Sequence, residues 1–157
     1  MATKDTPGVV APPPLIFLGF LVLGGVLDWL LPLAPSVPLG RETAWIIGGV
    51  LILAGIALIV GGVTNFVRAG TPVPTREPTA ALVTTGVHGF SRNPIYVSMF
   101  SMYLGIGIAA RSPWILLLVI AVALIIRYGV VAREERYLTR RFGDDYTSYK
   151  TRVRRWL

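Results

Sequence analysis

The sequence predicts an all-α integral membrane protein with about four transmembrane helices, followed by amphipathic helices in the cytoplasm. Three observations predict this fold class: 54% of the residues are hydrophobic, only 15% are charged, and the apolar residues gather in long blocks. A chain of 157 residues suffices for one domain and not comfortably for two, so we expect a single membrane domain over residues 1–157.

Four apolar blocks are candidates for transmembrane helices. They cover residues 15–31, 44–67, 95–110 and 114–132. A helix needs about 20 residues to cross the hydrocarbon core, so the third block, which also contains Gly105 and Gly107, is the weakest candidate. It can instead form a shorter, tilted or partly re-entrant helix. Residues 1–14 lack the features of a signal peptide, and we interpret them as a short cytoplasmic lead.

The charges predict the orientation of the chain. Cytoplasmic loops are enriched in Lys and Arg, so both termini and the loop over residues 68–93 are expected to be cytoplasmic. The net charge of +7 is thus distributed as in a membrane protein. The basic tail is expected to contact lipid headgroups. Nucleic acid is not an expected partner. The basic residues on this side are Lys4, Arg68, Arg76, Arg92 and eight more between residues 133 and 155, whereas Arg41 and Arg111 fall on the other side.

The chain has no cysteine and a single histidine, His88. Disulfides, thiolate catalysis and cysteine-based metal sites are therefore excluded, and no metal site is expected.

The second apolar block is rich in glycine and ends in an amide. Its glycines allow another helix to approach closely, from the same chain or from a second copy, so the oligomeric state stays open. Asn65, near the cytoplasmic end, should have a hydrogen-bonding partner or a ligand. The glycines are Gly48, Gly49, Gly55, Gly61 and Gly62.

Residues 82–96, with the sequence LVTTGVHGFSRNPIY, lie between apolar blocks and are expected to form a binding loop that leads into a helix. Gly86 and Gly89 permit tight turns or close approach to a ligand, Ser91 and Asn93 are potential helix caps, and Pro94 suits the first helical position. A helix N-terminus beside Arg92 favours an anionic group. The alternative is an ordinary capped loop. Residues 68–85 before it are expected to form an ordered lid or a shallow re-entrant strand, or else to be disordered.

The fourth apolar block is expected to continue into the cytoplasm as an amphipathic helix that ends at Gly143, with a second short amphipathic helix along the membrane surface. Glu134 and Glu135 lie at its start and project about 100° apart, so one of them can comfortably face a given cavity. Opposite the loop, such a carboxylate can bind the ammonium of a zwitterionic ligand whose carboxyl group goes to Arg92. The alternative is a solvated face on which both acids pair with neighbouring arginines.

The order of these motifs resembles the isoprenylcysteine carboxyl methyltransferase family and, more distantly, the phospholipid N-methyltransferases of the same membrane superfamily. The resemblance covers about residues 71–157 and assigns them to a catalytic core, with residues 15–67 as two N-terminal spans. The matching residues are Leu82 to Gly86, Arg92, Pro94, Tyr96, Glu134, Glu135, Phe142, Gly143, Asp144, Asp145, Tyr146, Tyr149 and Val153.

The resemblance implies that S-adenosylmethionine binds on the cytoplasmic side and that a lipophilic or lipid-anchored acceptor enters from the bilayer. Two residues depart from the family pattern: Asn93 replaces the motif histidine, and His88 stands where an aromatic residue is usual. Both can still contact the cofactor, although a role that needs a titrating histidine at position 93 is lost. The implied cofactor contacts are Leu82, Val83, Gly86, His88, Asn93, Pro94, Tyr96 and Glu134.

The candidate catalytic residues are Arg127, Arg92 and Glu135. Val130 occupies the place of the family's acceptor-site arginine, so Arg127, or else Arg133, is the expected substitute, although Arg127 can also extend to the lipid headgroups. An ionised carboxylate acceptor needs no base, whereas an amine acceptor needs one, for which Glu135 and His88 are candidates.

The leading hypothesis is therefore a membrane methyltransferase that uses S-adenosylmethionine and favours a carboxylate acceptor. The alternatives are a phospholipid or amine N-methyltransferase and, in another class, a structural membrane protein without catalytic activity.

Overall fold

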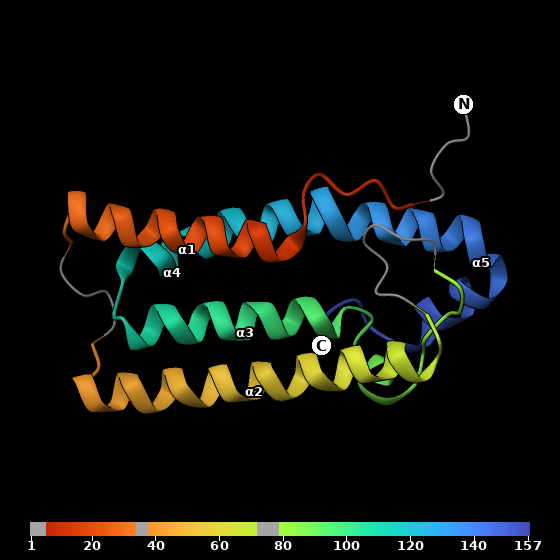
Figure 1. Ribbon diagram of the computed structural model, residues 1–157, viewed down its shortest axis with the longest axis horizontal. Helices are drawn as coiled ribbons and strands as arrows, with labels where there is room; N and C mark the ends of the chain where they lie inside the picture. The colour runs from red at the N-terminus through yellow and green to blue at the C-terminus, as the bar shows by residue number, and fades with distance from the viewer. Residues whose placement is uncertain (1–5, 34–37, 72–78) are drawn as a thin grey trace.

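The computed structural model describes residues 6–33, 38–71 and 79–157, and the regular structure in these ranges is entirely helical (Figure 1). Lys4, Arg76 and the middle of the expected lid lie outside the described residues. The elements in order are α1 (Pro13–Leu30), α2 (Arg41–Arg68), the short 3-10 helix η1 (Gly86–Gly89), α3 (Pro94–Ala109), α4 (Pro113–Leu124), the π-helix η2 (Ile125–Val131) and α5 (Ala132–Arg152).

The predicted membrane helices are present. Helices α1 and α2 and the continuous helix α4–η2–α5 are long and apolar enough to cross a membrane, whereas α3 is a shorter apolar helix. The fold class is thus confirmed, and the block expected to be weakest is the short one. The apolar part of the last helix ends at Ala132, because charged residues follow from Arg133 onward. Helix α1 starts at Pro13, inside the expected lead, since a proline loses no hydrogen bond in the first helical turn.

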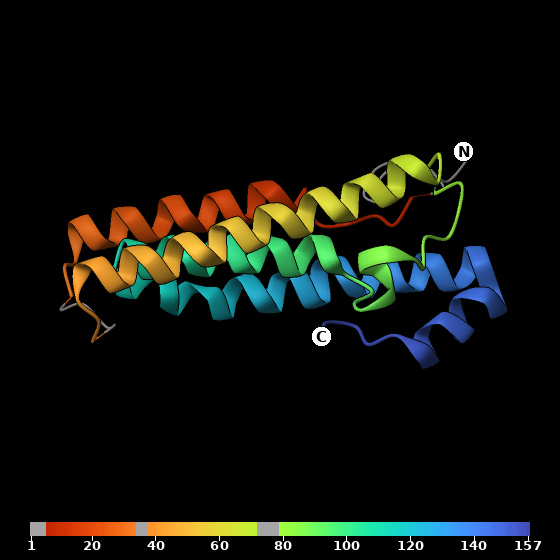
Figure 2. The ribbon, with the colours of Figure 1, turned by 90° about the horizontal axis from the view of Figure 1, so that it is seen from below.

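Helices α2 and α3 lie side by side (Figures 1 and 2). Gly48, Gly55 and Gly62 of α2 face α3. A Cβ atom on Gly48 would lie 2.5 Å from the carbonyl oxygen of Gly105, and one on Gly55 would lie 2.8 Å from that of Ser98. Ser101 of α3 also donates a hydrogen bond to the Leu51 carbonyl of α2, 2.7 Å away. The small residues therefore serve contacts within the chain.

The π-helix between α4 and α5 was not predicted. The lead packs on it: the Val10 amide donates to the Gly129 carbonyl at 3.3 Å, and Arg133 donates to the Gly8 carbonyl at 2.7 Å. Because a π-helix has wider turns than an α-helix, η2 changes the faces on which the following residues project, including Glu134 and Glu135.

Helix α5 is broken at Gly143, as the sequence predicts. This residue has φ 51° and ψ −120°, a conformation that favours glycine, and the second arm of α5 folds back toward the bundle (Figure 2). The chain then runs on to the start of α3, where the rings of Trp156 and Phe100 meet edge to face at 6.2 Å. The predicted position of this second arm along a membrane surface stays a prediction.

Candidate active site

The loop before α3 is held against the end of α2. Gly86 has φ 60°, and a Cβ atom there would collide with the side chain of Asn65. Asn65 donates a hydrogen bond to the Thr85 carbonyl at 2.8 Å, so this amide has the partner that its depth in the helix requires. Glycine at position 86 is thus needed both for its backbone conformation and for this close contact.

A narrow cavity lies between this part of the chain and both arms of α5. Six of its lining residues were predicted to belong to the site, and they come from the loop and from the start of α5, two places far apart in the sequence. The predicted residues are Leu82, Val83, Arg92, Asn93, Glu134 and Glu135; the others are Phe66, Thr79, Ala81, Leu138, Tyr146 and Tyr149.

Glu134 is a buried carboxylate at the wall of this cavity, beyond the apolar part of the last crossing. Its side chain is 6% exposed and accepts a hydrogen bond of 2.7 Å from the Tyr96 hydroxyl. No ion pair joins it to a cationic side chain of the described residues. Burial raises the pKa of the Glu134 carboxyl to about 8, the Tyr96 bond opposes this shift, and the charge of Glu135 adds to it.

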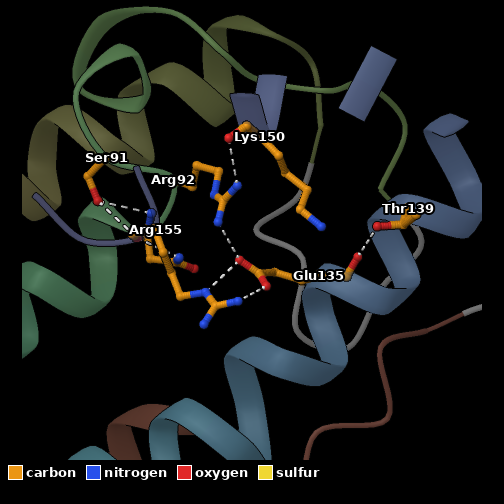
Figure 3. A network of polar contacts seen from close by, with 7 residues as sticks. Ser91, Arg92, Glu135, Thr139, Lys150 and Arg155 are labelled. Atoms are coloured by element: carbon orange, nitrogen blue, oxygen red, sulfur yellow. Dashed lines mark hydrogen bonds and ion pairs between the residues drawn. The ribbon is translucent and has the colours of Figure 1, made fainter. Parts of the chain in front are cut away.

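Glu135 also borders the cavity, although one glutamate alone was expected to face it comfortably, and the two acids differ in their partners. Oε1 of Glu135 accepts hydrogen bonds from Arg92 at 3.0 Å and from Arg155 at 2.9 Å, while Oε2 accepts one from Arg155 at 2.7 Å (Figure 3). Both oxygens are therefore committed to guanidinium groups. Glu135 anchors the site, whereas Glu134 keeps capacity for a ligand.

The residues after α5, 153–157, form hydrogen bonds with the loop that precedes α3. We call them the tail strap. The amide of Arg92 donates to the Arg154 carbonyl at 2.9 Å, and the side-chain amide of Asn93 donates to the Arg155 carbonyl at 2.9 Å. Asn93 precedes α3 at its N-cap position, with Pro94 first in the helix as predicted, but its side chain makes no capping bond. The turn before α3 is thus fixed by the far end of the chain.

Four predicted cofactor contacts lie outside the cavity lining. Gly86 and His88 face α2, and the His88 ring lies edge to face with Phe66 at 4.8 Å, with Nδ1 3.4 Å from the Asn65 amide. Burial lowers the pKa of His88 to about 4, so the imidazole is neutral at pH 7. Pro94 is buried at the start of α3, and Tyr96 stands behind the wall, where it contacts Glu134.

Arg127 lies in a separate groove between α3 and α4. Its exposed side chain places the guanidinium carbon 5.5 Å from the centroid of the Tyr128 ring. The other residues of the groove are mostly apolar: Val97, Phe100, Ala123, Trp156 and Leu157. The two alternatives for Arg127 were extension to the lipid headgroups and a place in a polar cavity; the structure shows its side chain exposed in a groove of otherwise apolar residues, and contact with headgroups stays a prediction. Arg133 is exposed and bonds to the lead.

Sequence reasoning missed the tail strap and Arg155. The apolar pattern of Leu138, Tyr146 and Tyr149 was visible, and these residues do form the inner face of both arms. Nothing in the sequence pairs Arg155 with Glu135, because that contact exists only once the second arm has folded back.

Comparison with known proteins now adds the family. Residues 43–145 match the sequence model of a family described as phospholipid methyltransferase, which covers well over half of the chain and includes the loop, α3 and both glutamates. The chain belongs to the phospholipid methyltransferase family. This match agrees with the membrane superfamily expected from the sequence and does not single out the isoprenylcysteine carboxyl methyltransferases.

A match to a curated relative is short. An uncharacterized protein of Haemophilus influenzae (strain ATCC 51907 / DSM 11121 / KW20 / Rd) is 54% identical over 39 residues, which are 25% of this chain and 62% of the relative. The chain thus spans less than two thirds of that relative's length. No solved structure matches the chain.

Proposed function

We propose that this phospholipid methyltransferase family member is an integral membrane methyltransferase that uses S-adenosylmethionine and acts on a lipophilic acceptor at the cytoplasmic face. The observation that carries the proposal is Glu134: a buried carboxylate without a cationic partner in the described residues, at the wall of a cavity shared by the loop and α5. A buried carboxylate of this kind is costly unless a ligand or a proton compensates it. The basic residues at this end of the bundle support the cytoplasmic placement.

The chemistry of the cavity fits the amino-acid end of the cofactor. Glu134 can accept hydrogen bonds from its ammonium group, and Arg92, whose Nε is buried without a partner in the described residues, supplies positive charge for its carboxylate. Leu82, Val83 and Leu138 add apolar surface. Bound there, S-adenosylmethionine would supply a methyl group on a sulfonium, which is transferred by in-line displacement and needs no acid or base from the protein for its departure.

The groove at Arg127 fits an acceptor that combines a hydrocarbon part with an anionic group. Val97, Phe100 and Trp156 provide apolar surface for the hydrocarbon, and the Arg127 guanidinium attracts the anion. The tail strap lies next to both openings: its Arg155 contacts Glu135, which lines the cavity, and its Trp156 lines the groove. Residues of the strap thus border both places that the reactants would occupy.

A carboxylate acceptor is favoured because the cavity offers little for deprotonation of an amine. Glu135 is bound to two guanidinium groups, and His88 lies outside the cavity lining. A carboxylate is already ionised, and its transfer from water into a partly apolar site raises its reactivity. The family description favours the second candidate, methylation of a phospholipid amine, for which the proton would have to pass to Glu134 or to water.

Isothermal titration of the detergent-purified protein with S-adenosylhomocysteine tests the proposal. We expect binding that weakens at least tenfold in Glu134→Gln. The matched control is Glu42→Gln, which removes the same charge at an exposed position at the start of α2 and should bind as the parent protein does. Absence of binding, or equal affinity in both variants, would favour a structural protein instead.

Methyl transfer from labelled S-adenosylmethionine then identifies the acceptor class. Prenylcysteine analogues, phosphatidylethanolamine and a total lipid extract should be compared, with Arg127→Gln tested on each active acceptor. We expect Arg127→Gln to raise KM for a carboxylate acceptor about tenfold while the affinity for S-adenosylhomocysteine stays unchanged. Label that appears in phosphatidylethanolamine alone would select the phospholipid N-methyltransferase.

A further inference from the structure

The two arms of α5 also enclose a second, open groove, which shares Glu135 with the cavity. We call it the α5 notch. The first arm contributes residues at helical spacing, which therefore share one face of the helix. The second arm contributes Lys150, whose side chain points toward the arm that carries Glu135 and Thr139 (Figure 3). The lining residues are Ala132, Glu135, Arg136, Thr139, Arg140 and Lys150.

The α5 notch has an excess of positive charge. Arg136, Arg140 and Lys150 line it, and the acid among its residues, Glu135, already binds Arg92 and Arg155. No acidic side chain of the described residues forms an ion pair with these three cations. The Nε of Arg136 donates to a carbonyl of its own helix, and the Lys150 ammonium lies 5.8 Å from the centroid of the Tyr146 ring. Three cationic groups are therefore available to one anion.

The start of the α5 notch lies at the depth of lipid headgroups. It begins at Ala132, where the apolar part of the last crossing ends, and reaches Arg140, eight residues and about 12 Å further along the helix. The headgroup layer on each side of the hydrocarbon core is about 5–8 Å thick, so Arg136, about 6 Å beyond Ala132, falls within it, and Arg140 lies at its aqueous side. Trp156, whose ring meets Phe100 of α3, is a residue type typical of the same interface.

We propose that the α5 notch binds the phosphate of an anionic phospholipid. Guanidinium and ammonium groups from two directions match a phosphate, and a lipid is favoured over a free phosphate because the notch starts where the bilayer core ends. A phosphate held by Arg136 and Arg140 on one arm and Lys150 on the other would bridge the two arms and hold the fold-back in place. The notch is a different opening from the cavity, although Glu135 lines both, and lipid binding there does not depend on methyl transfer.

Native mass spectrometry of the full chain in neutral detergent tests this proposal. Dioleoylphosphatidylglycerol and dioleoylphosphatidylcholine are added in equal amounts, and we expect at least tenfold preferential retention of the anionic lipid. The triple variant Arg136→Gln, Arg140→Gln, Lys150→Gln should lose that preference. The control triple variant Arg68→Gln, Arg152→Gln, Arg154→Gln removes the same charge from exposed side chains outside the notch and should keep it within about threefold.

Several results would overturn the proposal. Equal losses in the two triple variants would mean general attraction to a basic surface, and equal retention of both lipids by the parent protein would mean no site. Displacement of the anionic lipid by inorganic phosphate at equal concentration would identify free phosphate as the occupant. The single variant Arg140→Gln separates loss of the site from misfolding, because the Arg140 side chain makes no contact within the described residues that the change would remove. It should still lower retention of the anionic lipid about fivefold.

Discussion

The pH dependence of cofactor binding provides a direct test of the role assigned to Glu134. Burial raises the pKa of its carboxyl to about 8, so without a ligand this group is mostly protonated at pH 7. A ligand ammonium binds the ionised form. The proton must therefore leave Glu134 upon binding, and the affinity for S-adenosylhomocysteine should rise with pH until the pKa is passed.

The size of the effect follows from the ionised fraction. About 1% of a carboxyl with a pKa near 8 is ionised at pH 6 and about half at pH 8, so affinity should rise about fiftyfold over this range. Tyr96→Phe removes the 2.7 Å hydrogen bond that favours the charged form. Because a bond to a charged group is worth about 1.5–3 kcal/mol, the pKa should rise by one to two further units and displace the binding curve to higher pH.

Isothermal titration between pH 6 and pH 8.5 measures these curves. Tyr103→Phe is the matched control, since its hydroxyl is buried on the same helix and has no partner in the described residues. It should follow the parent curve, whereas Glu134→Gln should bind weakly and show no such pH dependence. An affinity of the parent protein that is constant from pH 6 to pH 8, or a Tyr103→Phe curve displaced like that of Tyr96→Phe, would refute the reasoning.

Three further predictions concern stability and the tail strap, with thermal unfolding in detergent as the common measurement. The pKa of His88 is lowered to about 4 in the folded protein, so the unfolded state binds more protons between about pH 6.5 and 4. The free energy of unfolding should therefore fall by at most about 3 kcal/mol as the pH drops through this window. His88→Gln should remove this part of the pH dependence of stability. Arg155→Gln removes the partly exposed ion pair with Glu135, 2.7 Å long, and should lower the free energy of unfolding by about 1–2 kcal/mol. It should also weaken the binding of S-adenosylhomocysteine about tenfold. The control Arg154→Gln, at an exposed neighbouring side chain, should change neither quantity. Gly48→Leu places a side chain against the backbone of α3 and should cost about 2–3 kcal/mol or more, whereas Gly49→Leu meets open space and should be close to neutral.

The features predicted well from the sequence are those that depend on local composition. Apolar blocks located the apolar helices to within a few residues, because a lipid environment demands continuous apolar helices. The proline at the start of α3 and the glycine break in α5 were visible for a similar reason: each residue restricts or extends the backbone conformations of its own position. The meeting of the loop with the start of α5 followed from the order of the motifs.

The features that the sequence could not predict depend on hydrogen bonds between distant segments. The π-helix leaves the apolar composition unchanged, so hydropathy carries no sign of it. Asn93 was expected to cap a helix or contact the cofactor, and its side chain instead binds the carbonyl of Arg155. The Asn93 contact depends on where the tail strap lies, and the π-helix meets another remote segment, the lead, through the Val10 amide.

Two adjacent glutamates acquire different properties because different parts of the chain surround them. Glu134 accepts a hydrogen bond from Tyr96 of α3 and forms no ion pair with a cation of the described residues, so it can ionise when a cationic ligand binds. Glu135, one residue on, meets two guanidinium groups that the loop and the tail strap bring to it. The fold-back at Gly143 delivers the second of these, since Arg155 follows the returning arm. The break in α5 therefore does more than end a helix: it pairs one carboxylate with arginines and leaves the other without a cationic partner, so that it can ionise when a cationic ligand binds.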